Sequence, residues 1–194
     1  MLLRGTKTNF PAKKFSFFLL VFLFISGISN AQTNLYSIGI DAGYSSMQSL
    51  SIPVTAGHFE LNFEFPSRLS DDLDFQLSCF YVRDMNYYIP DNLTNQNYPY
   101  YLGLTFQGVL RQNIKSKLFA EEEAGVLLLN NRFFFNQNET NYGIRFGISV
   151  GLDLTGESSN GFFIGIGYKV GITFNGSSPS FNSLTLKSQY VFEL

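Results

Sequence analysis

The chain has few of the residues from which metal sites, disulfides and active sites are usually built. Of its 194 residues, one is cysteine (Cys79) and one is histidine (His58). A lone cysteine cannot form an internal disulfide, and these two residues fall short of the clustered ligands of a zinc site. We therefore expect no metal, no cofactor and no disulfide framework, and we interpret Cys79 as a small apolar side chain.

Long apolar runs are also missing, apart from one near the N-terminus. This run, Phe15 to Ile28, follows Lys13 and Lys14 and is followed by the small residues of Ser29-Asn30-Ala31. It is short for a spanning helix, and its basic start and its end are typical of a secretory signal peptide. We expect residues 1–31 to be cleaved and residues 32–194 to form one domain. An uncleaved anchor would not explain the pattern that follows.

Basic residues are scarce in the predicted mature chain. The N-terminal 31 residues hold four of the 13 basic residues and none of the 15 acidic ones, so nine basic and 15 acidic residues remain, a net charge of −6. This is the wrong sign for a protein that binds nucleic acid.

The mature region is rich in strict alternation of apolar and polar residues. A period of two predicts strands with one apolar face and excludes a helix. Eight such segments follow one another to the end of the chain. They are 36–45, 58–65, 73–81, 99–111, 118–128, 142–153, 162–173 and 184–194.

The fifth segment breaks the pattern at Glu122. Leu118, Ala120, Ala124 and Val126 share an apolar face only if Glu122 lies on it too. A carboxylate that faces hydrocarbon is destabilising. Either a β-bulge at 121–123 shifts the register or the strand is locally shielded, and we favour the bulge.

The connections alternate in length. Those at about 46–57, 84–98, 130–141 and 175–183 are long, and those at 66–72, 112–117 and 155–161 are short. Membrane barrels have long extracellular loops and short periplasmic turns. An even number of strands places both termini on the periplasmic side, where the last strand can pair with the first and leave no open edge.

A soluble lipocalin-like barrel would alternate as well, with its apolar face inward. Aromatic residues near the segment ends, such as Tyr44 and Tyr81, favour a membrane barrel instead, as do the glycines of the polar face and the segment lengths. The predicted fold class is all-β, a closed eight-stranded antiparallel up-and-down transmembrane β-barrel. A secreted lipocalin-like binder of small ligands is the alternative.

The whole region of about 34–194 resembles the small eight-stranded outer-membrane barrels of the OmpA/OmpX type. Tyr190, Phe192 and Leu194 match the alternate spacing of that family's C-terminal assembly signal, although Leu194 stands where the family has an aromatic residue. The resemblance implies a monomer in the outer membrane of a Gram-negative bacterium, surrounded by lipid and inserted by the assembly machinery. The family includes anchors, adhesion and surface-defence proteins, and lipid-modifying enzymes.

Eight strands enclose a space that side chains can fill, so we expect no open pore. Charged residues on the inward face should form an ion-pair network in which Asp41 meets Lys187 across the seam between the last and first strands. A proton or ion path is the alternative. The expected members are Asp41, Glu60, Glu121, Glu123, Arg145, Lys169 and Lys187.

Catalysis would have to involve His58, near the extracellular end of the second strand and close to Ser45, Ser46 and Ser51. Outer-membrane deacylases carry a His-x-Ser arrangement, whereas Phe59 and Glu60 follow His58 here. We therefore expect a surface histidine and no enzyme, and a lipid hydrolase is the third interpretation.

Aromatic residues in the long loops predict a contact surface for a ligand or partner protein. Alternatively, strands five and six extend above the membrane and pair there. The predicted function is a non-enzymatic structural or surface-interaction role in the outer membrane. The loop residues are Tyr87, Tyr88, Phe133, Phe134 and Phe135.

Overall fold

The computed structural model describes residues 35–49, 52–67, 69–70, 73–88, 98–115, 117–132, 138–155, 160–174 and 178–193, and in this part of the chain it contains eight strands and one short 3₁₀ helix. These are β1 (Leu35–Gln48), β2 (Val54–Pro66), β3 (Leu73–Asp84), η1 (Met85–Tyr87), β4 (Tyr100–Lys115), β5 (Leu118–Arg132), β6 (Glu139–Asp153), β7 (Gly161–Thr173) and β8 (Ser180–Glu193). The predicted signal peptide, the residues Phe133, Phe134 and Phe135 of the fifth-to-sixth connection, and Leu194 lie outside the described residues. Among the described residues, no helix is long and apolar enough to cross a membrane.

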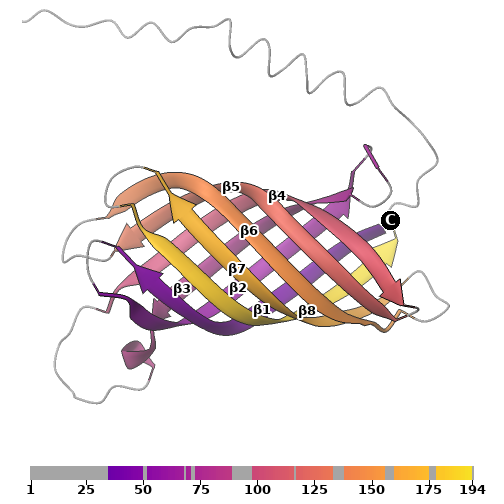
Figure 1. The fold of residues 1–194 in the computed structure, drawn as a ribbon, viewed down its shortest axis with the longest axis horizontal. Coiled ribbons are helices and arrows are strands. Elements are labelled where there is room, and N and C mark those ends of the chain that lie inside the picture. The colour runs from indigo at the N-terminus through magenta and orange to yellow at the C-terminus, as the bar shows by residue number, and fades with distance from the viewer. Residues whose placement is uncertain are drawn as a thin grey trace, which may run out of the picture.

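The strands pair in chain order, and β8 pairs back onto β1, so the sheet closes into a barrel (Figure 1). All of the pairs are antiparallel. The seam between β8 and β1 runs without a break from Leu35 opposite Glu193 to Gln48 opposite Ser180. The predicted fold class is confirmed.

The register sets the tilt of the strands. We start at Ser37 of β1 and move from each residue to its partner on the next strand. After one turn around the barrel this path returns to β1 at Met47, ten residues from the start. A stagger of this kind tilts the strands by about 40° from the barrel axis, and the slanted strands are visible in Figure 1. Each residue therefore rises about 2.5 Å along the axis.

The two faces of the sheet have opposite character. Ile148 is 63% exposed on the outside, whereas Arg145, three residues earlier on β6, is fully buried in the lumen. Large apolar side chains cover the outside of the other strands as well. A lipocalin-like barrel has the reverse arrangement, so the wall of this barrel matches lipid and not water.

Glycines on the inward face allow close packing where the wall is crowded. A Cβ atom on Gly43 would lie 2.0 Å from the Leu184 carbonyl oxygen, and one on Gly143 would lie 2.0 Å from the Ile172 carbonyl oxygen. Both obstacles are backbone atoms of the neighbouring strand, so larger residues would push strands apart.

The predicted β-bulge at 121–123 is wrong. Glu121, Glu122 and Glu123 pair in unbroken register with β4 and with β6. The irregularity lies instead between Asn113 and Lys115 of β4, next to the turn that leads to β5. Glu122 therefore keeps the outward orientation that the alternation gives it.

The strands extend farther than the alternation predicted, so the expected loop at 46–57 is wrong. Above the lipid-facing band the pattern inverts: Met47 and Ala56 are buried inside, and Thr55 is exposed outside. An inverted pattern suits a strand whose outer face meets water. Because it ends the run of outward apolar residues, the alternation alone placed the strand ends too early. The fifth and sixth strands also continue, as the alternative interpretation had it, and pair as far as Asn131 opposite Glu139.

Candidate functional site

Glu60 of β2 lies at the centre of the lumen and is fully buried. Its two carboxylate oxygens each accept a hydrogen bond from the Arg145 Nη2 atom of β6, at 2.7 Å. Lys169 of β7 donates to the same carboxylate at 3.0 Å, and the His58 Nε2 atom lies 3.1 Å from it. One carboxylate therefore connects two cations and an imidazole from three strands.

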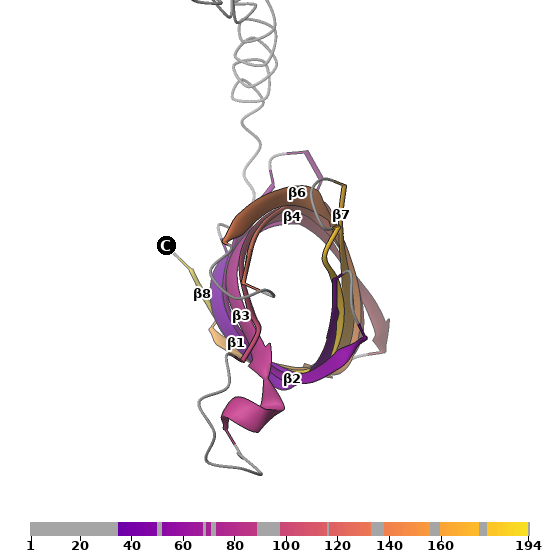
Figure 2. The ribbon, with the colours of Figure 1, turned by 90° about the vertical axis from the view of Figure 1, so that its left-hand side faces the viewer.

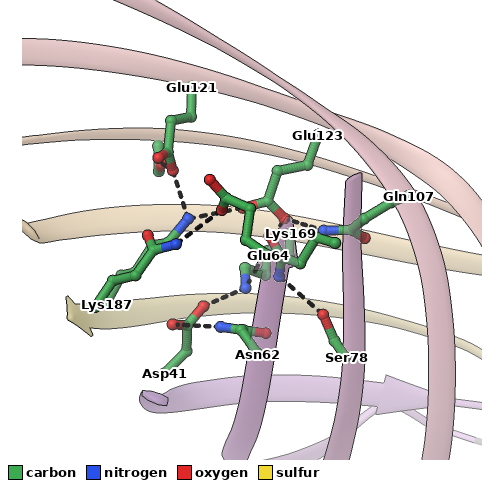
Figure 3. A network of polar contacts seen from close by, with 12 residues as sticks. Asp41, Asn62, Glu64, Ser78, Gln107, Glu121, Glu123, Lys169 and Lys187 are labelled. Atoms are coloured by element: carbon green, nitrogen blue, oxygen red, sulfur yellow. Dashed lines mark hydrogen bonds and ion pairs between the residues drawn. The ribbon is translucent and has the colours of Figure 1, made fainter. Parts of the chain in front are cut away.

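Lys169 extends this centre toward β1. Its ammonium group is hydrogen-bonded to Asp41 and lies 3.9 Å from the Glu123 Oε2 atom. Asn62 donates to the second oxygen of Asp41 at 3.0 Å, as Figure 3 shows. Both oxygens of this buried carboxylate are thus satisfied.

A second group of ion pairs lies nearer the periplasmic end. The Lys187 Nζ atom is 2.5 Å from Glu121 and 3.5 Å from Glu123 (Figure 3). Arg111 bridges Glu121, at 2.6 Å, and Glu64, at 2.8 Å. Arg111 and Glu64 were missing from the expected network, although both have the sequence parity of inward-facing residues.

All seven of the expected lumen residues thus lie in one set of contacts, but the expected pairing of Asp41 with Lys187 is wrong. The two residues are direct neighbours across the seam between β1 and β8. Their charged groups diverge, however: Asp41 pairs with Lys169, and Lys187 pairs with the carboxylates of β5. Long side chains in a narrow barrel can reach past the adjacent strand, so groups two or three strands away compete with the register neighbour.

A double-mutant comparison should separate the two pairings. Asp41→Ala and Lys169→Ala should show strong coupling, so that the double variant is more stable than the sum of the single losses predicts. Asp41→Ala with Lys187→Ala should be closer to additive. The measurement is the urea dependence of unfolding in detergent, and equal coupling in the two cycles would contradict the pairing.

His58 is also inside the barrel, and the expectation of a surface residue is wrong. It is 3% exposed, and its ring stacks on Phe80 at a centroid distance of 5.7 Å. The Nδ1 atom lies 2.9 Å from the Ser183 hydroxyl, which in turn donates to Ser45 at 2.9 Å. His58 therefore continues the polar network toward the extracellular end.

Apolar clusters lie inside the barrel on both sides of the charged centre. The cluster toward the periplasmic end contains Phe119, Phe163 and Val191, and the Arg111 guanidinium lies 4.5 Å from the Phe163 ring centroid. The larger cluster is toward the extracellular end. Its members are Met47, Ala56, Phe80, Val82, Tyr101, Leu127, Leu129 and Phe181.

Aromatic residues gather at the extracellular rim beside η1, which projects next to the barrel mouth in Figure 2. The Arg83 guanidinium lies 3.2 Å from the centroid of the Tyr87 ring and donates to the Tyr81 hydroxyl at 2.9 Å. Tyr87 meets Tyr88 and Tyr98 edge to face, at 5.3 Å and 5.8 Å. We call Arg83, Tyr87, Tyr88 and Tyr98 the rim patch.

The expected assembly residues of β8 lie on the outside at the periplasmic end. Tyr190 and Phe192 stack at a centroid distance of 6.1 Å. Phe192 also stacks on Tyr36 of β1, at 6.2 Å, and Tyr190 packs against Phe162 of β7, at 4.9 Å. These rings form part of an aromatic girdle across the seam.

A closed antiparallel barrel with an apolar outer wall and buried ion pairs defines a small transmembrane β-barrel of the outer-membrane type. No protein-family model and no curated protein sequence matches the chain.

Solved structures of small outer-membrane barrels share this fold. Neisserial surface protein A aligns with a TM-score of 0.63 and 10% identity, over 79% of this chain and 95% of its own. Ail of Yersinia pestis aligns with a TM-score of 0.52 and 14% identity, over 83% and 100%. The N-terminal barrel domain of Pseudomonas aeruginosa OprF gives 0.50 and 12%, over 83% and 98%. At these identities the likeness is one of fold.

Proposed function

We propose that this protein is a closed outer-membrane barrel that acts through its exposed surfaces, as a structural or surface-interaction protein, and that it is not a pore, a carrier or an enzyme. The observation that carries the proposal is the filling of the lumen. Ion-paired side chains occupy its centre, and apolar clusters lie on both sides of them. The rim and the outer wall are then the surfaces left for contact with other molecules.

The rim patch supports a surface-contact role. Tyr87 and Tyr88 are about half exposed although they lie at the water-facing end of the barrel. Exposed aromatic rings beside an arginine are typical of contact surfaces for proteins and sugars. The Ail barrel has been crystallised with the heparin analogue sucrose octasulfate. Here the patch contains more rings than cations, which favours a protein or a neutral sugar over a polysulfated one.

The arrangement of Ser183, His58 and Glu60 argues against a lipid hydrolase. Ser183 contacts His58, and His58 contacts Glu60, as serine, histidine and acid do in a hydrolase triad. All three residues, however, are buried inside the barrel. A hydrolase nucleophile must reach the ester bond of its substrate, whereas the Ser183 hydroxyl lies inside the closed barrel. Glu60 is already occupied by Arg145 and Lys169.

Conductance tests the closed lumen directly. The purified protein in a planar bilayer should give no steady conductance, because buried side chains fill the passage. Phe80→Ala with Phe181→Ala should also be silent, since the ion pairs below this cluster are retained. Steady steps from the unmodified protein would overturn the proposal, and steps that appear only in Asp41→Ala would favour an ion path with a gate. If the protein released fatty acid from lipopolysaccharide and His58→Ala abolished this release, the lipid-hydrolase interpretation would replace the proposal.

A further inference from the structure

Glu122 is a carboxylate on the outer wall of the barrel. It is exposed on β5, between Leu110 of β4 and Ile148 of β6 in the register. Within the described part of the chain, no cation forms an ion pair with it. The charged residues on either side along the strand, Glu121 and Glu123, point into the lumen and are paired there.

The position of Glu122 is deep in the lipid-facing band. Outward apolar residues of β5 run from Leu118 to Leu128, and the polar Asn130 follows. Glu122 lies about 10 Å along the barrel axis from Leu118 and about 15 Å from Leu128. Because the apolar band of such barrels is about 25 Å tall, a glutamate side chain here cannot reach either interface. An isolated carboxylate at this depth is strongly disfavoured.

Three small residues lie near Glu122 on the same wall. Gly108, Ala120 and Ala124 occupy outward positions, most of which carry larger side chains elsewhere on the wall. Two recesses in the wall, of about 340 Å³ and about 400 Å³, share Glu122 and Ile148 in their linings. Small residues let membrane-spanning segments approach closely, so this wall can accept another protein surface. We call Gly108, Ala120, Glu122, Ala124 and Ile148 the wall patch.

We propose that the wall patch is the interface of a symmetric dimer, in which the Glu122 carboxyl groups of two copies hydrogen-bond to each other. This replaces the monomer expected from the sequence. The proposal rests on the membrane location of the barrel and not on its closed lumen, so the conductance test and the dimer test can fail independently.

A second copy suits Glu122 for a geometrical reason. Chains inserted in the same direction can be related only by a two-fold axis along the membrane normal, and this axis places equivalent residues at equal depth. Each Glu122 therefore meets a hydrogen-bonding group at its own depth. Two neutral carboxyl groups complement each other, since each donates one hydrogen bond and accepts one. The recesses around them admit the side chains of the facing wall.

Disulfide cross-linking tests the interface in lipid bilayers. The background is Cys79→Ser, because Cys79 is exposed on the same outer surface. Ala124→Cys, which keeps Glu122, should give a linked dimer under a membrane-permeant oxidant. Ala42→Cys, an outward alanine on β1, is the matched control and should not. Adding Glu122→Leu should lower the Ala124→Cys yield about tenfold, whereas Glu122→Gln should retain it because two amides also pair.

Particle mass gives a second measurement without cross-linking. The Cys79→Ser protein in mild detergent should sediment as a dimer, Ala124→Phe should be monomeric because the ring fills the recess, and Ala42→Phe should remain dimeric. Heat-modifiable migration in gels verifies that each variant is folded. Equal linking at both cysteine positions, linking unaffected by Glu122→Leu, or a folded Cys79→Ser protein that is monomeric throughout would overturn the dimer.

Discussion

Replacing Glu60 with alanine should destabilise the barrel more than any other single change in the lumen, by about 3–5 kcal/mol. The substitution removes the carboxylate that accepts hydrogen bonds from Arg145 and Lys169. Lys169 keeps Asp41, but the nearest remaining hydrogen-bond partner of the Arg145 guanidinium is the Thr105 hydroxyl, at 3.4 Å. A guanidinium buried without a carboxylate is far more costly than the loss of one favourable contact. The measurement is the free energy of unfolding from urea titration in detergent.

Removing both charges is the control. Glu60→Ala with Arg145→Ala should recover part of the loss, because no unpaired guanidinium is left in the lumen. Glu193→Ala, which deletes an exposed carboxylate at the end of β8, should change stability by no more than about 0.5 kcal/mol. If the losses at Glu60 and Arg145 simply add, the two groups are not coupled in the folded barrel.

The barrel could be predicted from the sequence because its determinants are local. The alternation within each segment shows which of its residues face the same way. Because the polar face of every segment is the inward one, Glu60, Arg145 and Lys169 are all assigned to the interior. An even number of consecutive antiparallel strands then favours a closed meander, in which the last strand pairs with the first. None of these steps needs a contact between distant residues.

The partners inside the lumen could not be predicted in the same way. Which cation reaches Asp41 depends on the stagger of the whole barrel and on the length of each side chain, and neither is visible in one strand. Lys187 is next to Asp41 in the register but turns to Glu121, while Lys169 takes its place. His58 was misplaced for a related reason: an apolar cluster that includes Phe80 covers the inner face at the extracellular end, where a loop was expected.

The prediction of a β-bulge was wrong because it assumed that the backbone must turn a lipid-facing carboxylate away from the outer wall. The pairing of β5 with β4 and β6 shows no register shift at Glu122. The same segment contains Ala120 and Ala124, the two outward residues on either side of Glu122 along the strand, and their small size was a usable signal. Read together with Glu122, they indicate a wall that meets protein as well as lipid.

Arginine substitutions on the outer wall should show where Glu122 lies. Ile166→Arg places a cation deep in the apolar band and should cost about 2–4 kcal/mol. Ile148→Arg lies at a similar depth but directly opposite Glu122 on the neighbouring strand, where cross-strand side chains interact. The carboxylate should compensate part of the cost, so Ile148→Arg should be the milder of the two.

The Glu122→Leu background is the decisive control for this comparison. It should raise the cost of Ile148→Arg to that of Ile166→Arg and leave the cost of Ile166→Arg unchanged, because Ile148 is a register partner of Glu122 and Ile166 is not. Folding is measured by urea titration in lipid vesicles, at a lipid excess that keeps the chains apart, so that self-association does not contribute. If Ile148→Arg has the same cost in both backgrounds, Glu122 does not face it across the outer wall, and the wall patch loses its central residue.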